Sequence, residues 1–206
     1  SGSRADEVGS LAEAMSAMIS RLQRYLIEME AATAARERVE GELSAARDIQ
    51  IGMLPRKFPA FPERDDIDIH ALLEPAKEVG GDLYNFSMID ENRLFFVIGD
   101  VSGKGVPAAL FMAMASTLFK AASMTARDTA VLMARVNAEL VRDNVANLFV
   151  TAFCAVIDLR DGRVEYSDAG HEPPFLRRAD GTIERLAVAE GMALGVWEEP
   201  EFGKSR

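Results

Sequence analysis

The feature that most constrains this chain is a proline-free stretch, residues 5–54, with a regular apolar repeat. The repeat advances in alternating steps of four and three residues. Arg36 and Gln50 fall in this register but interrupt its apolar character. This spacing is the seam of a coiled coil, and it extends over about six heptads. The seam residues are Leu11, Met15, Met18, Leu22, Tyr25, Met29, Ala32, Val39, Leu43, Ala46 and Met53.

A lone helix of this length cannot bury such a stripe, so it needs a partner. We therefore predict that residues 8–54 form a homodimer. The alternative is one long helix folded back onto its own domain. A sustained period of 3.5 residues favours the straight, supercoiled partner.

The repeat stops at Pro55, and the remaining sequence divides in two. Residues 55–66 contain three prolines and form a connector, which leaves a domain at 67–206. Hairpin-linked strands around an inserted helical pair predict an α+β fold with an antiparallel β-sandwich flanked by helices. We expect helices at 106–122 and 127–143, strands at 67–74, 82–89, 93–99, 148–158 and 163–168, and a strand pair joined at Asp180-Gly181.

Composition excludes several classes of protein. The chain has 33 acidic and 23 basic residues and a net charge of −10, which argues against a nucleic-acid partner. Its single cysteine, Cys154, allows no intramolecular disulfide, fits a reducing cytoplasm, and is predicted to be a core residue. The longest apolar run, 148–157, is too short to cross a bilayer, so we expect no membrane contact by these residues.

Two segments place an aspartate beside glycines at the end of a strand: Glu78–Asp82 and Gly99–Gly105. Glycines allow a close approach of the backbone and leave carboxylate and carbonyl oxygens free to bind a hard cation. If the two strands are neighbours, Asp82 and Asp100 converge, and they would repel unless protonated or bridged by a metal. A Walker A loop is excluded, because Ile98 replaces its first glycine and Gly105 its Ser or Thr.

Four blocks carry a family resemblance: EVGGDLYNF, FFVIGDVSGKGVPAALFMA, NLFVTAFCAVID and YSDAGHEPPFL. In this order they resemble the bacterial metal-dependent Ser/Thr phosphatases of the stage II sporulation protein E type, which belong to the protein phosphatase 2C superfamily. The resemblance spans residues 45–196 and implies the α-β-β-α sandwich of that superfamily. Residues 6–18 are similar to the second helix of a HAMP signal-relay domain, with Glu7 and Gly9 at its motif positions, which implies a parallel dimer.

The resemblance implies two Mn²⁺ or Mg²⁺ ions that activate water to attack a phosphoserine or phosphothreonine. Asp100 matches the metal-bridging aspartate, the carbonyl of Val101 matches a backbone ligand, and Asp82 matches a further acidic ligand. The implied substrate is a phosphorylated STAS-type protein such as an anti-sigma-factor antagonist. The implied location of the domain is the cytoplasm. The resemblance leaves open whether membrane spans precede residue 1 and anchor the full-length protein in the inner membrane.

The sequence also departs from the family. Relatives continue past the equivalent of residue 206 with a Thr-Asp-Gly block and another acidic ligand, so we expect a domain truncated at its C-terminus, an incomplete metal site and weak activity. Asp158 and Asp168 do not match the motif of the missing ligand, and we interpret His171 as a hydrogen-bonded loop residue.

The alternative function is a non-catalytic dimerisation and signal-relay module. If the phosphatase is active, we expect the stalk to control metal affinity through helices 106–122 and 127–143.

Overall fold

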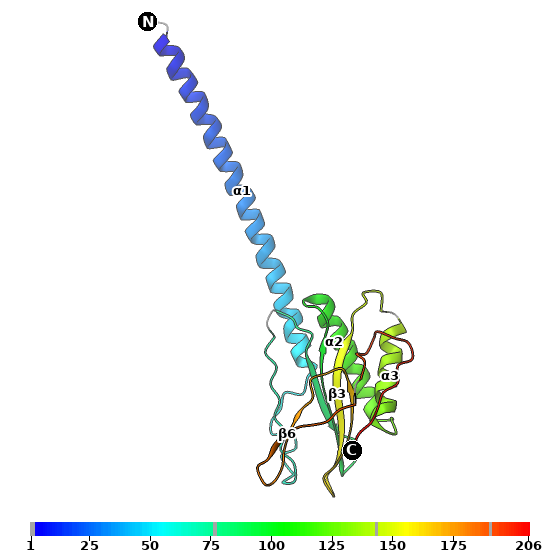
Figure 1. The fold of residues 1–206 in the computed structure, drawn as a ribbon. Coiled ribbons are helices and arrows are strands. Elements are labelled where there is room, and N and C mark those ends of the chain that lie inside the picture. Colours follow the sequence, from blue (N-terminus) through cyan, green and yellow to red (C-terminus); the bar gives the residue numbers. More distant parts are fainter. Residues whose placement is uncertain (1–2, 76–77, 143, 190) are drawn as a thin grey trace. The chain divides into compact units, whose positions relative to one another are not determined.

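The computed structural model describes residues 3–75, 78–142, 144–189 and 191–206, with side chains from residue 9 onward. Figure 1 shows a long helix followed by a compact α+β domain. The elements are α1 (Ser3–Gly52), β1 (Leu83–Met88), β2 (Arg93–Val101), α2 (Val106–Ser123), α3 (Thr129–Arg142), β3 (Val150–Asp158), β4 (Arg163–Ala169), β5 (Phe175–Arg177) and β6 (Ile183–Arg185).

The chain divides into two units between Ala45 and Ala46. The last two turns of α1 therefore belong to the second unit, whereas the sequence placed the domain boundary at Pro55. The HAMP-like motif lies in the first unit, where the side chain of Glu7 falls outside the described residues.

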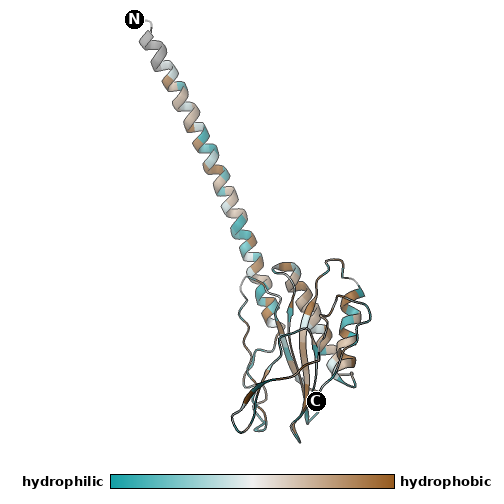
Figure 2. Ribbon diagram, in the orientation of Figure 1, coloured by the Kyte–Doolittle hydropathy of each residue, from teal (hydrophilic) through white to brown (hydrophobic). Residues whose placement is uncertain are grey.

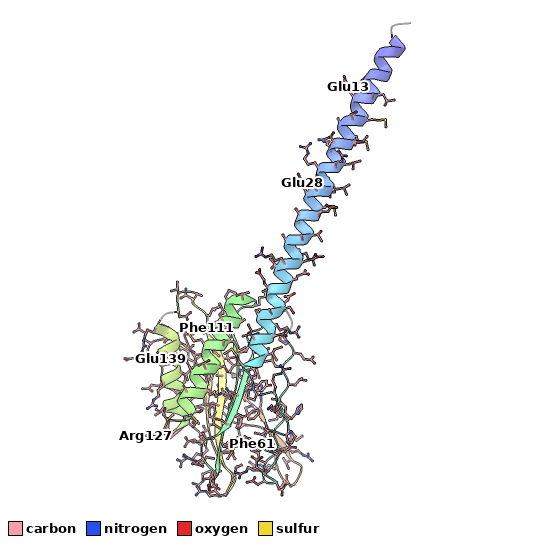
Figure 3. The ribbon with its side chains drawn as sticks, turned by 180° about the vertical axis from the view of Figure 1, so that it is seen from behind. Glu13, Glu28, Phe61, Phe111, Arg127 and Glu139 are labelled. Atoms are coloured by element: carbon pink, nitrogen blue, oxygen red, sulfur yellow. The ribbon has the colours of Figure 1, made fainter. Side chains whose placement is uncertain are left out.

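Residues 9–45 of α1 have no core of their own. The seam side chains from Leu11 to Met29 are exposed, and Figure 2 shows this helix as alternating hydrophobic and hydrophilic bands. Charged side chains such as Glu13 and Glu28 are distributed along it (Figure 3). Two ion pairs with i,i+4 spacing, Arg36–Glu40 and Arg38–Glu42, lie on the exposed surface of this helix.

The second unit is built on an antiparallel sheet with strand order β1-β2-β3-β4. The register pairs Leu83 with Gly99, Asp100 with Thr151, and Phe153 with Asp168. The predicted strands at 82–89, 93–99, 148–158 and 163–168 are thus confirmed, as is the α+β class. The strand pair predicted around Asp180-Gly181 forms a separate two-stranded sheet, β5-β6.

Helices α2 and α3 pack together on one face of the sheet, and the core lies between them and the strands. Phe111 of α2 is buried in this core, whereas Glu139 of α3 forms a surface ion pair with Arg142 (Figure 3). Asp128 caps the start of α3 by accepting the amide hydrogen of Val131 at 2.8 Å. By length and composition α2 could cross a bilayer, but eight of its side chains are buried, as expected for a core helix.

The opposite face of the sheet is covered differently. A small cluster of Phe153, Ala155 and Tyr166 packs against Leu186 and Val188, which follow β6. The predicted strand at 67–74 is wrong: these residues form no strand. Side chains there alternate between half-buried and exposed, so the pattern correctly indicated that one side faces the protein, but alternation alone does not provide a neighbouring strand for the backbone.

Candidate active site

The predicted site residues meet on the face of the sheet that points away from α2 and α3. Leu83 and Val101 belong to the core under the helices. Because side chains alternate along a strand, Asp100, and by the same alternation Asp82 just before β1, belong to the other face. The pairing of Leu83 with Gly99 makes the two aspartates neighbours, as the sequence predicted.

The electrostatics of Asp100 agree with this register. Partial burial and the neighbouring charge of Asp82 raise the pKa of Asp100. The His171 ring partly offsets this shift. Such a pair is destabilising when both members are ionised, and a bound divalent cation would relieve the repulsion.

Two glycines allow the backbone to come close at this point. A Cβ on Gly81 would lie 2.8 Å from the carbonyl oxygen of Val101, and one on Gly99 would lie 2.8 Å from the carbonyl oxygen of Thr151. The Val101 amide in turn donates a hydrogen bond to the Gly81 carbonyl at 3.3 Å. The Val101 carbonyl, which the resemblance implies is a metal ligand, therefore sits beside both aspartates because residue 81 has no side chain.

Thr151 and His171 extend the site along the sheet. Thr151 lies opposite Asp100, and its hydroxyl donates a 3.3 Å hydrogen bond to the Asp100 carbonyl oxygen. The same hydroxyl is 3.0 Å from Nδ1 of His171. His171 is thus a hydrogen-bonded loop residue, as interpreted from the sequence, and its partner Thr151 ties the Ala169–His171 turn to the strand end that carries Asp100.

Asp168 completes the row at the end of β4. It is buried, and its carboxylate accepts the amide hydrogens of Gly170 at 2.8 Å and His171 at 3.3 Å. Burial raises the pKa of Asp168, and these two amides oppose the shift. Asp168 therefore shapes the turn that positions His171. Asp158 lies at the far end of the sheet, paired with Arg160.

Gln50 connects the end of α1 to the site. Its side chain is buried, with Nε2 donating to the carbonyls of Gly80 at 2.7 Å and Ala109 at 3.3 Å. Its Oε1 accepts the Gly80 amide hydrogen at 3.1 Å. Gly80 precedes Asp82 by two residues, and Ala109 lies in the first turn of α2, so one carboxamide holds both segments that flank the aspartates.

Asp82 and Asp100 lie on paired strands, as the sequence predicted, and their role as metal ligands with Val101 stays a prediction. Sequence reasoning did not single out Thr151 or Gln50 as neighbours of this site. The antiparallel register of a strand pair could have found Thr151, and a polar residue on a coiled-coil seam was the signal for Gln50. Cys154 is buried in the core as predicted, and burial raises the pKa of its thiol.

These residues fit part of a divalent-cation site. Asp82, Asp100 and the Val101 carbonyl offer oxygen ligands, which Mg²⁺ and Mn²⁺ prefer. In the described part of the chain, no group of three or more His, Cys, Asp or Glu side chains is arranged to hold a metal ion. The two carboxylates and the Val101 carbonyl provide the candidate ligand oxygens, and the incomplete metal site expected from the sequence stays a prediction.

The chain is similar to several known proteins. Residues 90–206 match the family described as stage II sporulation protein E (SpoIIE). The chain is 31% identical to Protein IcfG of Synechocystis sp., over 98% of the chain and 35% of that protein. It is 32% identical to the phosphoserine phosphatase RsbU of Bacillus subtilis, over 81% of the chain and 48% of that protein.

The chain thus spans between a third and a half of the length of these curated relatives. Among solved structures, the SiaA-PP2C domain of Pseudomonas aeruginosa superposes with a TM-score of 0.68 at 21% identity, covering 84% of this chain and 68% of that one. The RsbU and RsbW domains of Rv1364c from Mycobacterium tuberculosis give a TM-score of 0.55 at 24% identity, over 63% and 36%. At these identities the likeness concerns the fold.

Proposed function

Because this chain belongs to the stage II sporulation protein E family, we propose that it carries the active site of a metal-dependent protein serine/threonine phosphatase. The observation that supports this most directly is the pair of aspartates, Asp82 and Asp100, brought together on one sheet face beside the Val101 carbonyl. Similarity to RsbU and RsbP of Bacillus subtilis, both named phosphoserine phosphatases, points to the same reaction.

In this proposal Asp82, Asp100 and the Val101 carbonyl hold one or both of two Mn²⁺ or Mg²⁺ ions. Bound there, the metal supplies Lewis-acid activation of water and neutralises charge on the phosphoryl oxygens. Gly81 keeps space for the Val101 carbonyl, and Thr151 fixes the backbone at Asp100. No side chain needs to form a phosphoenzyme, which agrees with the buried position of Cys154.

The experiment that tests the reaction is metal-dependent hydrolysis of a phosphoserine protein by the product of the complete reading frame. We expect Asp100→Asn to abolish turnover while the fold survives, since it removes one charge and little volume. Asp158→Asn, at the other end of the sheet, is the matched control and should retain turnover. A wild-type protein that folds, dimerises and binds no divalent cation would instead favour the non-catalytic relay module.

The substrate we propose is a phosphorylated STAS-type protein, as the family resemblance implies, and we place the domain in the cytoplasm. A panel of phosphorylated proteins with and without the STAS fold tests the first point. Equal turnover of all of them would contradict it.

We further propose that residues 8–54 form a parallel homodimer. Support comes from the exposed seam of α1, which leaves a long apolar stripe uncovered. Gln50 and the residues after it are part of the second unit, so the test compares residues 46–206 with residues 1–206. Light scattering should give a monomer for the first and a dimer for the second. A dimeric 46–206 protein would place the contact elsewhere.

Finally, we propose that the helix controls the site through Gln50. A rotation of α1 would move a carboxamide that is bonded to both Gly80 and Ala109, and α2 in turn packs on α3. Insertions of one to four residues near Ala34 rotate the seam by about 100° per inserted residue. They should change the Mn²⁺ concentration that activates the full-length protein. In a Gln50→Ala background the same insertions should have a smaller effect, with thermal melting as the check on folding. Activity that ignores every insertion would rule out the coupling.

A further inference from the structure

Beside the candidate active site lies a short segment, residues 191–198, that is anchored firmly yet presents apolar side chains outward. Leu194 pairs with Val150 through two backbone hydrogen bonds, of 2.9 and 2.8 Å. Asn137, fully buried on α3, accepts the Gly195 amide hydrogen at 2.9 Å and donates to the Trp197 carbonyl at 2.8 Å. Asn144 donates to the Gly195 carbonyl at 3.0 Å. The segment's backbone is therefore held in place by buried polar side chains.

Its side chains point the other way. Trp197, the chain's only tryptophan, is 61% exposed, and Met192 and Val196 are nearly half exposed. The three line a shallow groove together with Glu198, Glu199 and Pro200. Exposed Trp and Met side chains are among those that contribute most in protein interfaces.

The groove starts where the active site ends. A Cβ on Gly170 would lie 3.3 Å from the carbonyl oxygen of Gly191, so the 191–193 backbone packs on the turn that carries His171. Leu194 then bonds to Val150, the neighbour of Thr151. The segment that carries the groove thus begins against the turn of His171 and the strand end of Thr151.

We propose that the groove of Met192, Val196 and Trp197 is the docking surface for the phosphoprotein substrate, and that it selects apolar and cationic side chains near the phosphorylated residue. The apolar part follows from the exposed Trp197 and Met192. The cationic part follows from charge, because the exposed Glu198 and Glu199 line the groove and the chain as a whole is acidic. This inference rests on the proposed phosphatase function and specifies its substrate.

The test uses the full-length protein with Mn²⁺ and three probes. One is p-nitrophenyl phosphate, which is too small to reach the groove. The others are two phosphoserine peptides of equal length, with Leu and Lys or with Ser and Glu beside the phosphoserine. Wild type should prefer the Leu/Lys peptide. Trp197→Ala should lower its kcat/KM about tenfold, mainly through KM, and leave p-nitrophenyl phosphate unchanged.

Glu198→Gln with Glu199→Gln should reduce the preference for Lys over Glu, with the effect weakening in high salt. Ile183→Ala, which truncates an exposed apolar side chain on β6, is the control and should change nothing. Equal losses on p-nitrophenyl phosphate and peptide, no preference between the peptides, or a change of oligomeric mass in Trp197→Ala would each overturn the docking surface. Failure of the wild type to hydrolyse p-nitrophenyl phosphate would instead refute the phosphatase function itself.

Discussion

The two ends of the four-stranded sheet hold aspartates in opposite electrostatic settings. At the end formed by the β1–β2 and β3–β4 turns, each aspartate faces an arginine, and the pKa of Asp158 is lowered to about 2 by hydrogen bonds from Arg160. The pairs are Asp90–Arg93 at 2.7 Å, Asp158–Arg160 at 2.5 Å and Asp161–Arg163 at 3.0 Å.

At the other end are Asp82, Asp100 and Asp168. In the part of the chain that the structure describes, none of the three forms an ion pair with Lys or Arg, and the pKa values of Asp100 and Asp168 are raised. Ionised aspartates therefore stabilise the fold at one end of the sheet, and they oppose folding at the other end. The second arrangement is expected of a site whose missing positive charge comes from a ligand.

The largest expected effect is that of a divalent cation. At a concentration of about 100 times its dissociation constant, Mn²⁺ should stabilise the 206-residue chain by about 2.7 kcal/mol, which corresponds to several degrees in Tm. The incomplete ligand set predicts weak binding, so millimolar Mn²⁺ will be needed. Differential scanning calorimetry with Mn²⁺, and with Na⁺ at the same ionic strength, measures the difference in Tm. Micromolar binding of two ions in titration calorimetry would contradict the weak-site prediction.

A smaller effect should follow from one methyl group at the site end. Gly81→Ala would push against the Val101 carbonyl oxygen and should weaken Mn²⁺ binding about tenfold, or 1.4 kcal/mol. Its counterpart is Gly162→Ala in the β3–β4 turn, where a Cβ meets open space but φ is +71°. That change should cost about 1 kcal/mol of stability and leave Mn²⁺ affinity unaltered. Equal Mn²⁺ affinity in both variants would show that the Val101 carbonyl is not part of the metal site.

Neutralising one aspartate at each end should change stability in opposite directions. Because the folded-state pKa of Asp100 is raised, its charged form opposes folding at pH 7, and Asp100→Asn should raise Tm in the absence of metal. This gain should vanish as the pH falls through that raised pKa. Asp158→Asn should lower Tm at pH 7, and its loss should vanish only as the pH approaches 2. Thermal melts from pH 7 to pH 2 measure both, and two shifts of the same sign would remove the contrast.

The smallest effect concerns the Thr151 hydroxyl. Thr151→Val keeps the shape of the side chain but removes its hydrogen bonds to the Asp100 carbonyl and to His171, at a cost of about 1 kcal/mol. We expect Mn²⁺ affinity to fall a few-fold in Thr151→Val and to recover in Thr151→Ser. If the serine variant behaves like valine, the hydroxyl has no positioning role.

The sequence predicted the α+β class and the strand pairing that makes Asp82 and Asp100 neighbours, but not all of their surroundings. Glycines beside aspartates at two strand ends were enough to expect Asp82 and Asp100 together, because one hairpin joins them. Thr151 was missed because its place beside Asp100 depends on the β2–β3 pairing across 51 residues, which no local sequence pattern indicates. The prediction of a strand at 67–74 was wrong for a related reason. The alternation of apolar and polar residues indicates which side is buried, whereas strand pairing requires a neighbour with free backbone groups.

The seam position of Gln50 also bears on how such proteins could be recombined. Gln50 continues the alternating steps that begin at Leu11, and its carboxamide is hydrogen-bonded to Gly80 inside the domain. The rotation of the last turns of the helix about its own axis is therefore fixed by these bonds. A foreign helix grafted upstream would present its seam in the native direction only when the distance from the junction to Gln50 is conserved in whole heptads. If residues 8–54 form the proposed coiled coil, the heptad rather than the single residue is the unit in which an upstream helix can be exchanged.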